Sequence, residues 1–383
     1  MDTVALKQSW AQAAALGDQV PSWFYAHLFL THPEVRDMFP IRMAEQRDKL
    51  VAALGAAVSN VDQLDKVVPV LEQLGRDHRR FGAVTAHYDA VGASLLATLR
   101  HFFGPAWSPE LHAAWSEAYG TVAKVMVTAA EQAEDSAPAV WEAEVIRFDR
   151  RSVEVATFEV VPKQPFSYRA GQSIAMKIPQ RPREWRYYSP ANAPDQSGRM
   201  EFHVQPIDGG LVSGPLVHKL RPGHVVQLGS PVGQQLTLPD DGPLPDLLMV
   251  AGGTGLAPFR ALLQQIDRRF RGNGPAPLVH LFHGARMSWN LYDHQYLSEL
   301  AQKPWFDYTP VVSEDPTYPG KRGLVGEVAA GAGDWSRRVA LVCGSPGMVE
   351  HTTRALTAAG VPADAIRREQ FHFHAVSPHE ATR

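Results

Sequence analysis

The run Arg186-Tyr187-Tyr188-Ser189, followed later by Gly209-Gly210-Leu211-Val212-Ser213, decides how the rest of this chain is interpreted. An arginine, an aromatic residue and a hydroxyl in a row are, by themselves, the content of an ordinary β-strand. A guanidinium group can also bind phosphate through two parallel hydrogen bonds, and an aromatic face can pack on a flat ring. These residue types therefore suit a ligand that has both a phosphate and a planar ring.

The pair of stretches resembles the flavin-binding signature of the ferredoxin-reductase superfamily. The resemblance implies that Tyr188 packs on the isoalloxazine of FAD, that Ser189 bonds near its reactive edge, and that Arg186 pairs with the pyrophosphate. The family often has an aromatic residue at the position of Ser173, which we keep as a candidate flavin contact. The remaining candidate flavin residues are Tyr187, Gly209, Gly210, Val212 and Ser213.

The surroundings of this signature alternate between apolar and polar residues, which predicts antiparallel strands at 141–148, 153–158, 186–190, 200–205 and 224–229. The stretch Arg169–Ser173 indicates a tight turn. We therefore expect a small antiparallel β-barrel over residues 138–243 that carries FAD at its edge.

A different pattern follows from residue 244 to 383. The apolar run Leu247–Ala251 leads into a glycine-rich turn and then a helix, an order that favours phosphate binding because the backbone can approach closely and a helix N-terminus attracts anions. Two more apolar runs, at 278–282 and 339–343, also end in glycine turns. Alternating strands and helices predict a parallel sheet.

This region resembles the pyridine-nucleotide domain of ferredoxin reductases, which implies NADH or NADPH as the ligand. The candidate nucleotide residues in the first turn are Gly252, Gly253, Thr254, Gly255, Leu256, Ala257 and Pro258. Cys343 and Gly344 match the family's motif near the nicotinamide. Glu369 and Phe371 match its C-terminal acid and the aromatic residue over the flavin. Without the glycine that follows it, Cys343 would be interpreted as a small buried residue at a strand end.

Composition limits the class of protein. The length of 383 residues predicts two or three domains, and 45% hydrophobic residues are typical of a globular chain. A net charge of -3 argues against nucleic acid as a partner, and one Cys fits a reducing cytoplasm. The first residues do not have the pattern of a signal peptide, and no apolar run approaches the ~18 residues of a spanning helix. We therefore expect a cytoplasmic protein without an integral membrane segment.

The first third is predicted to be helical. Residues 1–135 hold 6 of the 30 Pro and 7 of the 30 Gly, and their apolar residues recur at helical spacing. His78 belongs to a stripe with Leu71, Leu74 and Phe81. A single histidine on an apolar face is usually a core residue, and the segment has five others, so the stripe alone does not make His78 a metal ligand.

The order and spacing of Tyr25, Phe39, Gln46 and His78 resemble the globin domain of flavohaemoglobins, and so do local strings such as His78–Phe81 and Ala118-Tyr119-Gly120. The resemblance implies that His78 is the axial ligand of haem b iron. It implies that Phe39 wedges the haem and that Leu50 is an apolar neighbour on the distal side. Tyr25 and Gln46 would then donate to bound O2.

On the proximal side, the resemblance implies that Tyr88 helps to orient the histidine through a network with a glutamate. Ala130 occupies the position where that glutamate usually sits, and Glu131 is next to it. One residue on a helix turns a side chain by roughly 100°. Either the helix register differs locally, which makes Glu131 the partner, or the network is weakened. Asp77 is a possible substitute partner, or simply an exposed carboxylate.

The expected organisation is an all-α globin over 1–135, the barrel over 138–243 and the α/β nucleotide domain over 244–383. This order resembles a flavohaemoglobin along essentially the whole chain. The resemblance implies a nitric oxide dioxygenase that converts NO and O2 to nitrate with electrons from NAD(P)H through FAD to haem, without an obligate protein partner. The alternatives are an NADH-driven haem and flavin oxidoreductase with another acceptor, and a haem-based sensor of O2 or NO. Arg286 could pair with the 2′-phosphate of NADPH or be solvated.

Overall fold

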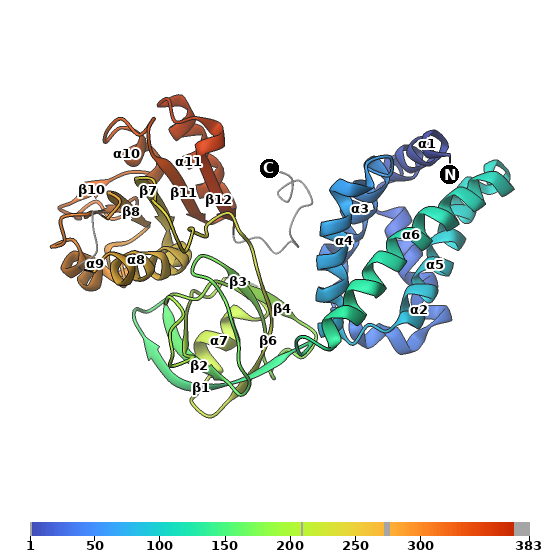
Figure 1. Ribbon diagram of the computed structural model, residues 1–383, viewed down its shortest axis with the longest axis horizontal. Coiled ribbons are helices and arrows are strands. Elements are labelled where there is room, and N and C mark those ends of the chain that lie inside the picture. Colours follow the sequence, from blue (N-terminus) through green and yellow to red (C-terminus); the bar gives the residue numbers. More distant parts are fainter. Residues whose placement is uncertain (1, 208–209, 272–275, 371–383) are drawn as a thin grey trace. The chain divides into compact units, whose positions relative to one another are not determined.

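The computed structural model describes residues 2–207, 210–271 and 276–370, which fall into two compact units. The described residues up to Val140 form a helical unit, coloured blue to green in Figure 1. Those from Trp141 onward form a second unit that contains two β-sheets and their helices. Among the residues described, no helix has the length and apolar character needed to cross a membrane.

The helical unit has the all-α composition predicted for it. Its α-helices in the described part of the chain are α1 (Thr3–Ala15), α2 (Gln19–Thr31), α3 (Ala44–Ser59), α4 (Leu64–His78), α5 (Thr85–Phe103) and α6 (Pro109–Glu134). Asp2 caps α1 by accepting the N–H groups of Val4 and Ala5 at 3.1 and 3.0 Å. Ser108 caps α6 by accepting from Leu111 N at 3.2 Å. Side-chain oxygens at these positions satisfy N–H groups that have no partner within the helix.

Helices α4 and α6 approach each other closely, and this contact sets the register between them. A Cβ atom on Gly75 would lie 2.2 Å from the carbonyl oxygen of Met126, so only glycine fits there. One turn after Gly75, just beyond the end of α4, Arg79 donates to the carbonyl oxygens of Ala133 and Ala137 at 3.0 and 2.9 Å. The two helices therefore run side by side in the same direction, and the turn around residue 130 lies opposite the end of α4.

The first sheet of the second unit is the predicted antiparallel barrel. Its described strands are β1 (Trp141–Arg150), β2 (Ala156–Pro162), β3 (Ser173–Lys177), β4 (Trp185–Tyr188), β5 (Met200–Val204) and β6 (Val225–Val232), in the order β4-β3-β6-β1-β2-β5. An antiparallel bridge between Pro190 and Phe202 joins the two ends of this order and closes the sheet. Phe158 and Phe202 stack inside it, with ring centroids 5.6 Å apart. Helix α7 (Ser213–Lys219) follows β5.

The second sheet is parallel, as the alternating strands and helices predicted. Its described strands are β7 (Leu247–Gly252), β8 (Val279–Ala285), β9 (Phe306–Val312), β10 (Lys321–Arg322), β11 (Val339–Gly344) and β12 (Ile366–Gln370), in the order β10-β9-β8-β7-β11-β12. The chain begins in the middle at β7, builds toward β10, and then returns to the other side of β7. The loops after β7 and β11 therefore diverge, and ligands of open α/β sheets bind at this point.

Helices cover both faces of the parallel sheet, and alternate residues of β7 point to opposite faces. Leu247, Met249 and Ala251 pack with α8 (Leu256–Phe270) and α9 (His294–Leu300). Leu248 and Val250 pack with α10 (Val325–Ala330) and α11 (Pro346–Ala358) on the other face. Figure 1 shows these helices around the sheet in yellow to red. Because both faces of β7 are buried, its sequence is a continuous run of apolar residues.

Candidate functional site

Tyr25 on α2 and Gln46 on α3 form a hydrogen-bonded pair, although 21 residues separate them in the sequence. Gln46 Nε2 donates to Tyr25 Oη at 3.1 Å, and Tyr25 Oη lies 3.4 Å from the main-chain carbonyl oxygen of Gln46. Tyr25 is only 5% exposed. Burial raises the pKa of Tyr25 to about 12, so its phenol remains protonated and able to donate. The structure brings these two predicted residues together.

An aromatic cluster borders this pair. Tyr25, Phe29 and Phe39 have ring centroids between 5.3 and 5.7 Å apart. Phe39 and Leu50 are only partly buried while they pack on the globin core. Partly exposed apolar side chains beside a donor pair can contact a flat apolar group such as haem, which fits the role predicted for these two residues.

His78 is the last residue of α4, and its imidazole is oriented by the main chain. Nδ1 lies 2.6 Å from the carbonyl oxygen of Leu74, so Nδ1 carries the proton and donates. Burial lowers the pKa of His78, which favours the neutral ring. A neutral imidazole whose Nδ1 is engaged leaves Nε2 available for a metal, so this arrangement fits haem iron. Phe81 and Tyr88 pack against the ring, with centroids 6.1 and 6.4 Å away.

The carboxylates near His78 differ from the predicted network. The Tyr88 hydroxyl is buried and has no hydrogen-bond partner within the described part of the chain. Glu131 is exposed on α6, and its carboxylate contacts neither Tyr88 nor His78 among the described residues. Asp77 is not the exposed carboxylate considered above: it lies 3.5 Å from Arg80 and burial raises its pKa.

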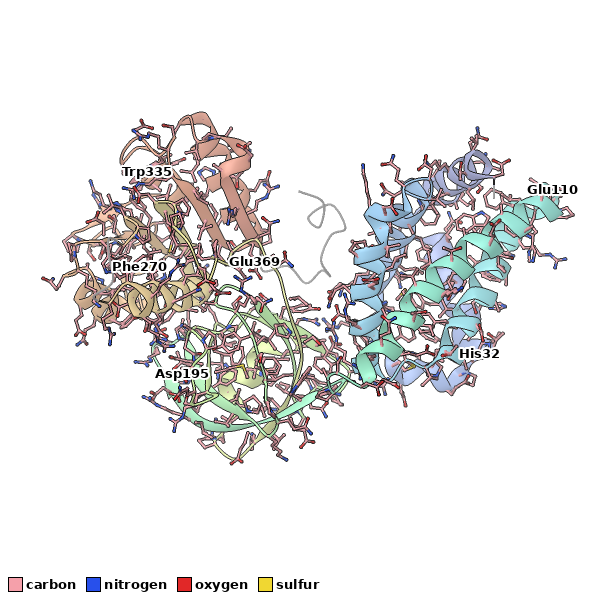
Figure 2. All side chains as sticks on the ribbon, in the orientation of Figure 1. His32, Glu110, Asp195, Phe270, Trp335 and Glu369 are labelled. Atoms are coloured by element: carbon pink, nitrogen blue, oxygen red, sulfur yellow. The ribbon has the colours of Figure 1, made fainter. Side chains whose placement is uncertain are left out.

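Two hydroxyls and a carboxylate meet at the predicted flavin edge. Ser189 Oγ lies 2.9 Å from Ser173 Oγ, and both residues are buried. Ser173 Oγ also donates to the carboxylate of Glu369, which lies at the end of β12 (Figure 2). Three residues predicted separately are therefore joined by hydrogen bonds, and the serine at position 173 has a specific polar role instead of an aromatic one.

Arg186 and Tyr188 lie on β4, next to this group. Arg186 Nη1 donates to the carbonyl oxygen of Trp185 at 2.8 Å and lies 3.1 Å from Glu184 Oε2. Glu184, which is buried and immediately precedes β4, was not predicted as a partner of Arg186. Tyr188 pairs with Ile174 of β3, and burial raises its pKa above the ordinary value, so it remains a neutral aromatic ring.

The glycine turn after β5 is described only in part. Gly209 and Phe371 lie outside the described residues. A Cβ on Gly210 would lie 2.6 Å from Ser213 Oγ and 2.8 Å from the carbonyl oxygen of Ile207. Ser213 Oγ accepts from Ile207 N at 3.1 Å, and Val212 is buried beside it. The turn requires glycine at position 210 because of this close packing.

The first turn of the parallel sheet brings two predicted nucleotide segments together. A Cβ on Gly255 would lie 2.3 Å from the carbonyl oxygen of Cys343 and 2.9 Å from the Cα of Gly344. Gly253 has a φ of 53°, a conformation that favours glycine. Thr254 belongs to the same turn, and Leu256, Ala257 and Pro258 are buried where α8 begins. The turn after β7 therefore packs backbone against backbone on the end of β11, with the Met348 side chain over Gly252 and Gly344. A glycine-rich turn of this kind fits close approach by a dinucleotide.

Cys343 and His283 lie near the ends of β11 and β8, the strands on either side of β7. Cys343 is fully buried, and burial together with the Glu369 carboxylate raises its pKa well above the ordinary value, so it is a thiol. His283 Nε2 lies 3.1 Å from the carbonyl oxygen of Gly253 and donates to it. His283 was not predicted, and the signal that could have found it is its position at the end of the second apolar strand.

These sites define a class of protein: a single-chain oxidoreductase that combines a haem-binding globin with a flavin barrel and a nicotinamide-nucleotide sheet. Residues 22–126 match the globin family, residues 143–236 match the oxidoreductase FAD-binding domain, and residues 249–354 match the oxidoreductase NAD-binding domain.

The relatives agree with this class. The flavohemoprotein of Bacillus subtilis is 26% identical, over 93% of this chain and 92% of that protein, and that of Halalkalibacterium halodurans is 27% identical over 84% of each. The flavohemoglobin of Malassezia yamatoensis with bound FAD and heme has the same fold, with a TM-score of 0.78 and 15% identity over 97% of this chain and 98% of that one. The FAD/NAD-binding domain of nitric oxide dioxygenase from Vibrio cholerae has a TM-score of 0.53 and 20% identity over 60% of this chain and 98% of that one.

The chain combines a globin domain with FAD-binding and NAD-binding oxidoreductase domains, and it is similar to flavohemoproteins over most of its length. The expected fold class and the expected cofactors, haem, FAD and a nicotinamide nucleotide, are confirmed.

Proposed function

We propose that this protein is an NAD(P)H-dependent nitric oxide dioxygenase that converts NO and O2 to nitrate. The observation that carries the proposal is the Tyr25–Gln46 pair, in which a neutral phenol and an amide meet on the side of the globin that the family uses for O2. The flavin and nucleotide segments in the same chain supply the electrons that such a reaction consumes. The Vibrio cholerae domain of similar fold belongs to a nitric oxide dioxygenase, which supports the same activity here.

The electron balance sets the stoichiometry. Nitrogen loses three electrons between NO and nitrate, while O2 gains four, so each nitrate requires one electron from outside. When bound, the nucleotide supplies a hydride, FAD divides it into single electrons, and haem iron supplies the centre at which O2 is activated. One nucleotide therefore supports the formation of two nitrate ions.

The residues of this chain would bind the cofactors, orient them and donate hydrogen bonds to O2. Nε2 of His78 would hold the iron, because the hydrogen bond from Nδ1 to Leu74 orients the ring. Tyr25 and Gln46 would place N–H and O–H donors where negative charge develops on oxygen. Arg186 would hold the FAD pyrophosphate, and the hydroxyl of Ser189 would face the reactive edge of the ring.

The acid–thiol pair would act beside the nicotinamide. Glu369 accepts from Ser173, which in turn contacts Ser189, so these side-chain oxygens form a hydrogen-bonded path along which a proton can pass. Cys343 remains a neutral thiol, because burial disfavours its charged form, and it would pack against the ring instead of attacking it.

The proposal is tested by following NADH, NO and nitrate together in the purified holoprotein. We expect rapid NO loss that requires both O2 and NADH, with two nitrate ions formed for each NADH oxidised. NADH oxidation that does not respond to NO would favour an oxidoreductase with another acceptor. Binding of O2 or NO without steady NADH oxidation would favour a sensor.

A further inference from the structure

A buried polar network links the flavin barrel to the nucleotide sheet, and none of its members belongs to the cofactor sites described above. Its barrel members, Glu201 and His203, lie on β5. Its members in the nucleotide part are Arg260 on α8, together with Tyr292 and Asp293 just before α9. His203 and Asp293 are 4% and 6% exposed, which is unusual for charged or ionisable side chains.

The charged side chains of the network form ion pairs between the barrel and the nucleotide part. Arg260 Nη1 donates to Glu201 Oε2 at 2.6 Å and to the carbonyl oxygen of Ala191 at 3.1 Å, and both of these partners belong to the barrel. Arg260 Nε also lies 3.0 Å from Asp293 Oδ2. Although burial raises the pKa of Glu201, hydrogen bonds from His203 and Arg260 lower it to about 2, so the carboxylate is charged.

The remaining hydrogen bonds of the network depend on Tyr292. His203 Nε2 lies 3.1 Å from Glu201 Oε1, and a carboxylate can only accept, so Nε2 carries a proton. His203 Nδ1 lies 3.0 Å from Tyr292 Oη. Burial, reinforced by Asp293, raises the pKa of Tyr292 well above its ordinary value, so the phenol keeps its proton. His203 therefore bridges the two residues, with Nε2 donating to Glu201 and Nδ1 facing the Tyr292 hydroxyl.

The network reaches the nucleotide turn. The rings of His203 and His283 both pack edge-on against Tyr292, with centroids 5.3 and 5.9 Å away. His283 then donates from Nε2 to the carbonyl oxygen of Gly253. A continuous set of buried contacts thus runs from a barrel strand to the turn that approaches the dinucleotide.

A second link from the barrel ends at the same turn. Glu154 Oε2 accepts from Gln205 Nε2 at 2.9 Å and from Asn290 Nδ2, in the nucleotide part, at 3.0 Å. A Cβ on Gly253 would lie 3.3 Å from Gln205 Oε1. The nucleotide turn is therefore held by His283 on one side and approached by a barrel side chain on the other.

We propose that Tyr292 and His203 are positioning residues for hydride transfer, because their hydrogen bond fixes the nucleotide sheet, and with it the Gly253 turn, against the flavin barrel. Hydride transfer depends steeply on the distance and angle between donor and acceptor, and a misplacement of about 1 Å can cost about 100-fold in rate. The inference rests on the flavin and nucleotide assignments of the proposed function and is independent of the reaction at haem.

The test is stopped-flow reduction of bound FAD by NADH in the full-length holoprotein, with Tyr292→Phe as the main variant. This change keeps the ring and removes only the hydroxyl. We expect the rate constant of flavin reduction at saturating NADH to fall about tenfold or more, with a larger isotope effect from deuterated NADH. FAD content and the dissociation constant of NADH should change less than about threefold, because the variant removes no group that contacts either cofactor.

Tyr308→Phe is the matched control. Tyr308 Oη lies 3.4 Å from His294 Nδ1, so it is also a partly buried tyrosine beside a histidine, but both residues belong to the nucleotide part. The control should reduce flavin at the parent rate. His203→Gln, which keeps a donor and an acceptor, should retain more of the rate than His203→Leu.

Three outcomes decide the proposal. A slower hydride step in Tyr292→Phe alone supports it. An unchanged rate and isotope effect, or an equal loss in Tyr308→Phe, overturns it and leaves the network a role in folding only. Nitrate formation by protein reduced with dithionite tests the proposed function separately, since that electron supply bypasses NADH.

Discussion

Replacing Tyr25 with Phe removes one hydroxyl from the pair on which the functional proposal depends. In the parent, that hydroxyl accepts from Gln46 Nε2 at 3.1 Å and lies 3.4 Å from the Gln46 carbonyl oxygen, so the free protein already satisfies it. The phenyl ring should keep its contacts with Phe29 and Phe39, whose centroids lie 5.7 and 5.5 Å away. The change therefore tests the donor with little disturbance of packing.

The magnitude follows from the loss of one hydrogen bond. The 3.1 Å bond is neutral and of ordinary length, so its loss should lower the free energy of unfolding by about 1 kcal/mol. A donor lost from bound O2 costs about 1–3 kcal/mol, and each 1.36 kcal/mol is tenfold. We therefore expect O2 to dissociate roughly fivefold to 150-fold faster.

The assay is flash photolysis and stopped-flow measurement of O2 dissociation, combined with nitrate formation. Turnover to nitrate should slow, while reduction of FAD by NADH should stay at the parent rate. Tyr119→Phe provides a matched control, because Tyr119 is also a phenol within the globin but donates to the carbonyl oxygen of Tyr88 at 2.6 Å. An O2 dissociation rate equal to the parent's would refute the donor role, and Tyr25 would then be an ordinary core aromatic.

Four further predictions test the other sites. His78→Gly should lose the parent haem spectrum and regain it with added imidazole; an unchanged spectrum would identify another ligand. Arg186→Ala should lower FAD occupancy and leave haem bound, and equal retention of FAD would contradict the flavin assignment. Ala130→Glu should lower the haem reduction potential, because it places a carboxylate opposite the end of α4. Glu131→Gln changes an exposed side chain and should leave the potential unchanged. A shifted potential in Glu131→Gln would make Glu131 the partner of the proximal histidine. Burial lowers the pKa of His283 to about 4, so the unfolded state binds one more proton than the folded state between pH 6.5 and 4. The free energy of unfolding should therefore decrease by up to about 3 kcal/mol as the pH falls through this window. His283→Gln should reduce this pH dependence in denaturant titrations.

Local patterns in the sequence predicted the fold class, and the family resemblance of its motifs predicted the cofactors. The change from helical spacing to alternation after residue 140 separated the globin from the barrel, and the glycines after Leu247–Ala251 located the nucleotide turn. These features are local because helical and strand periodicities, and the need for glycine at a close backbone approach, act over a few residues. The order of Tyr25, Gln46 and His78, through its resemblance to the globin domain of flavohaemoglobins, predicted which residues form the haem site.

Tertiary structure alone decided which side chains meet. Glu131 and Ala130 are neighbours in sequence, yet their side chains differ in direction by roughly 100° around the helix. Glu131 is exposed, while the register set at Gly75 and Met126 places Ala130 opposite the end of α4. Ser173 and Glu369 form a hydrogen bond across 196 residues.

The Tyr292–His203 bond joins strand β5 of the barrel to the segment just before α9, so no pattern within either segment could predict it. Such contacts depend on the relative rotation of whole elements, which is set by packing and chain connection. The sequence by itself therefore predicted what each segment binds, and the assembled fold decided which side chains lie within hydrogen-bonding distance of one another.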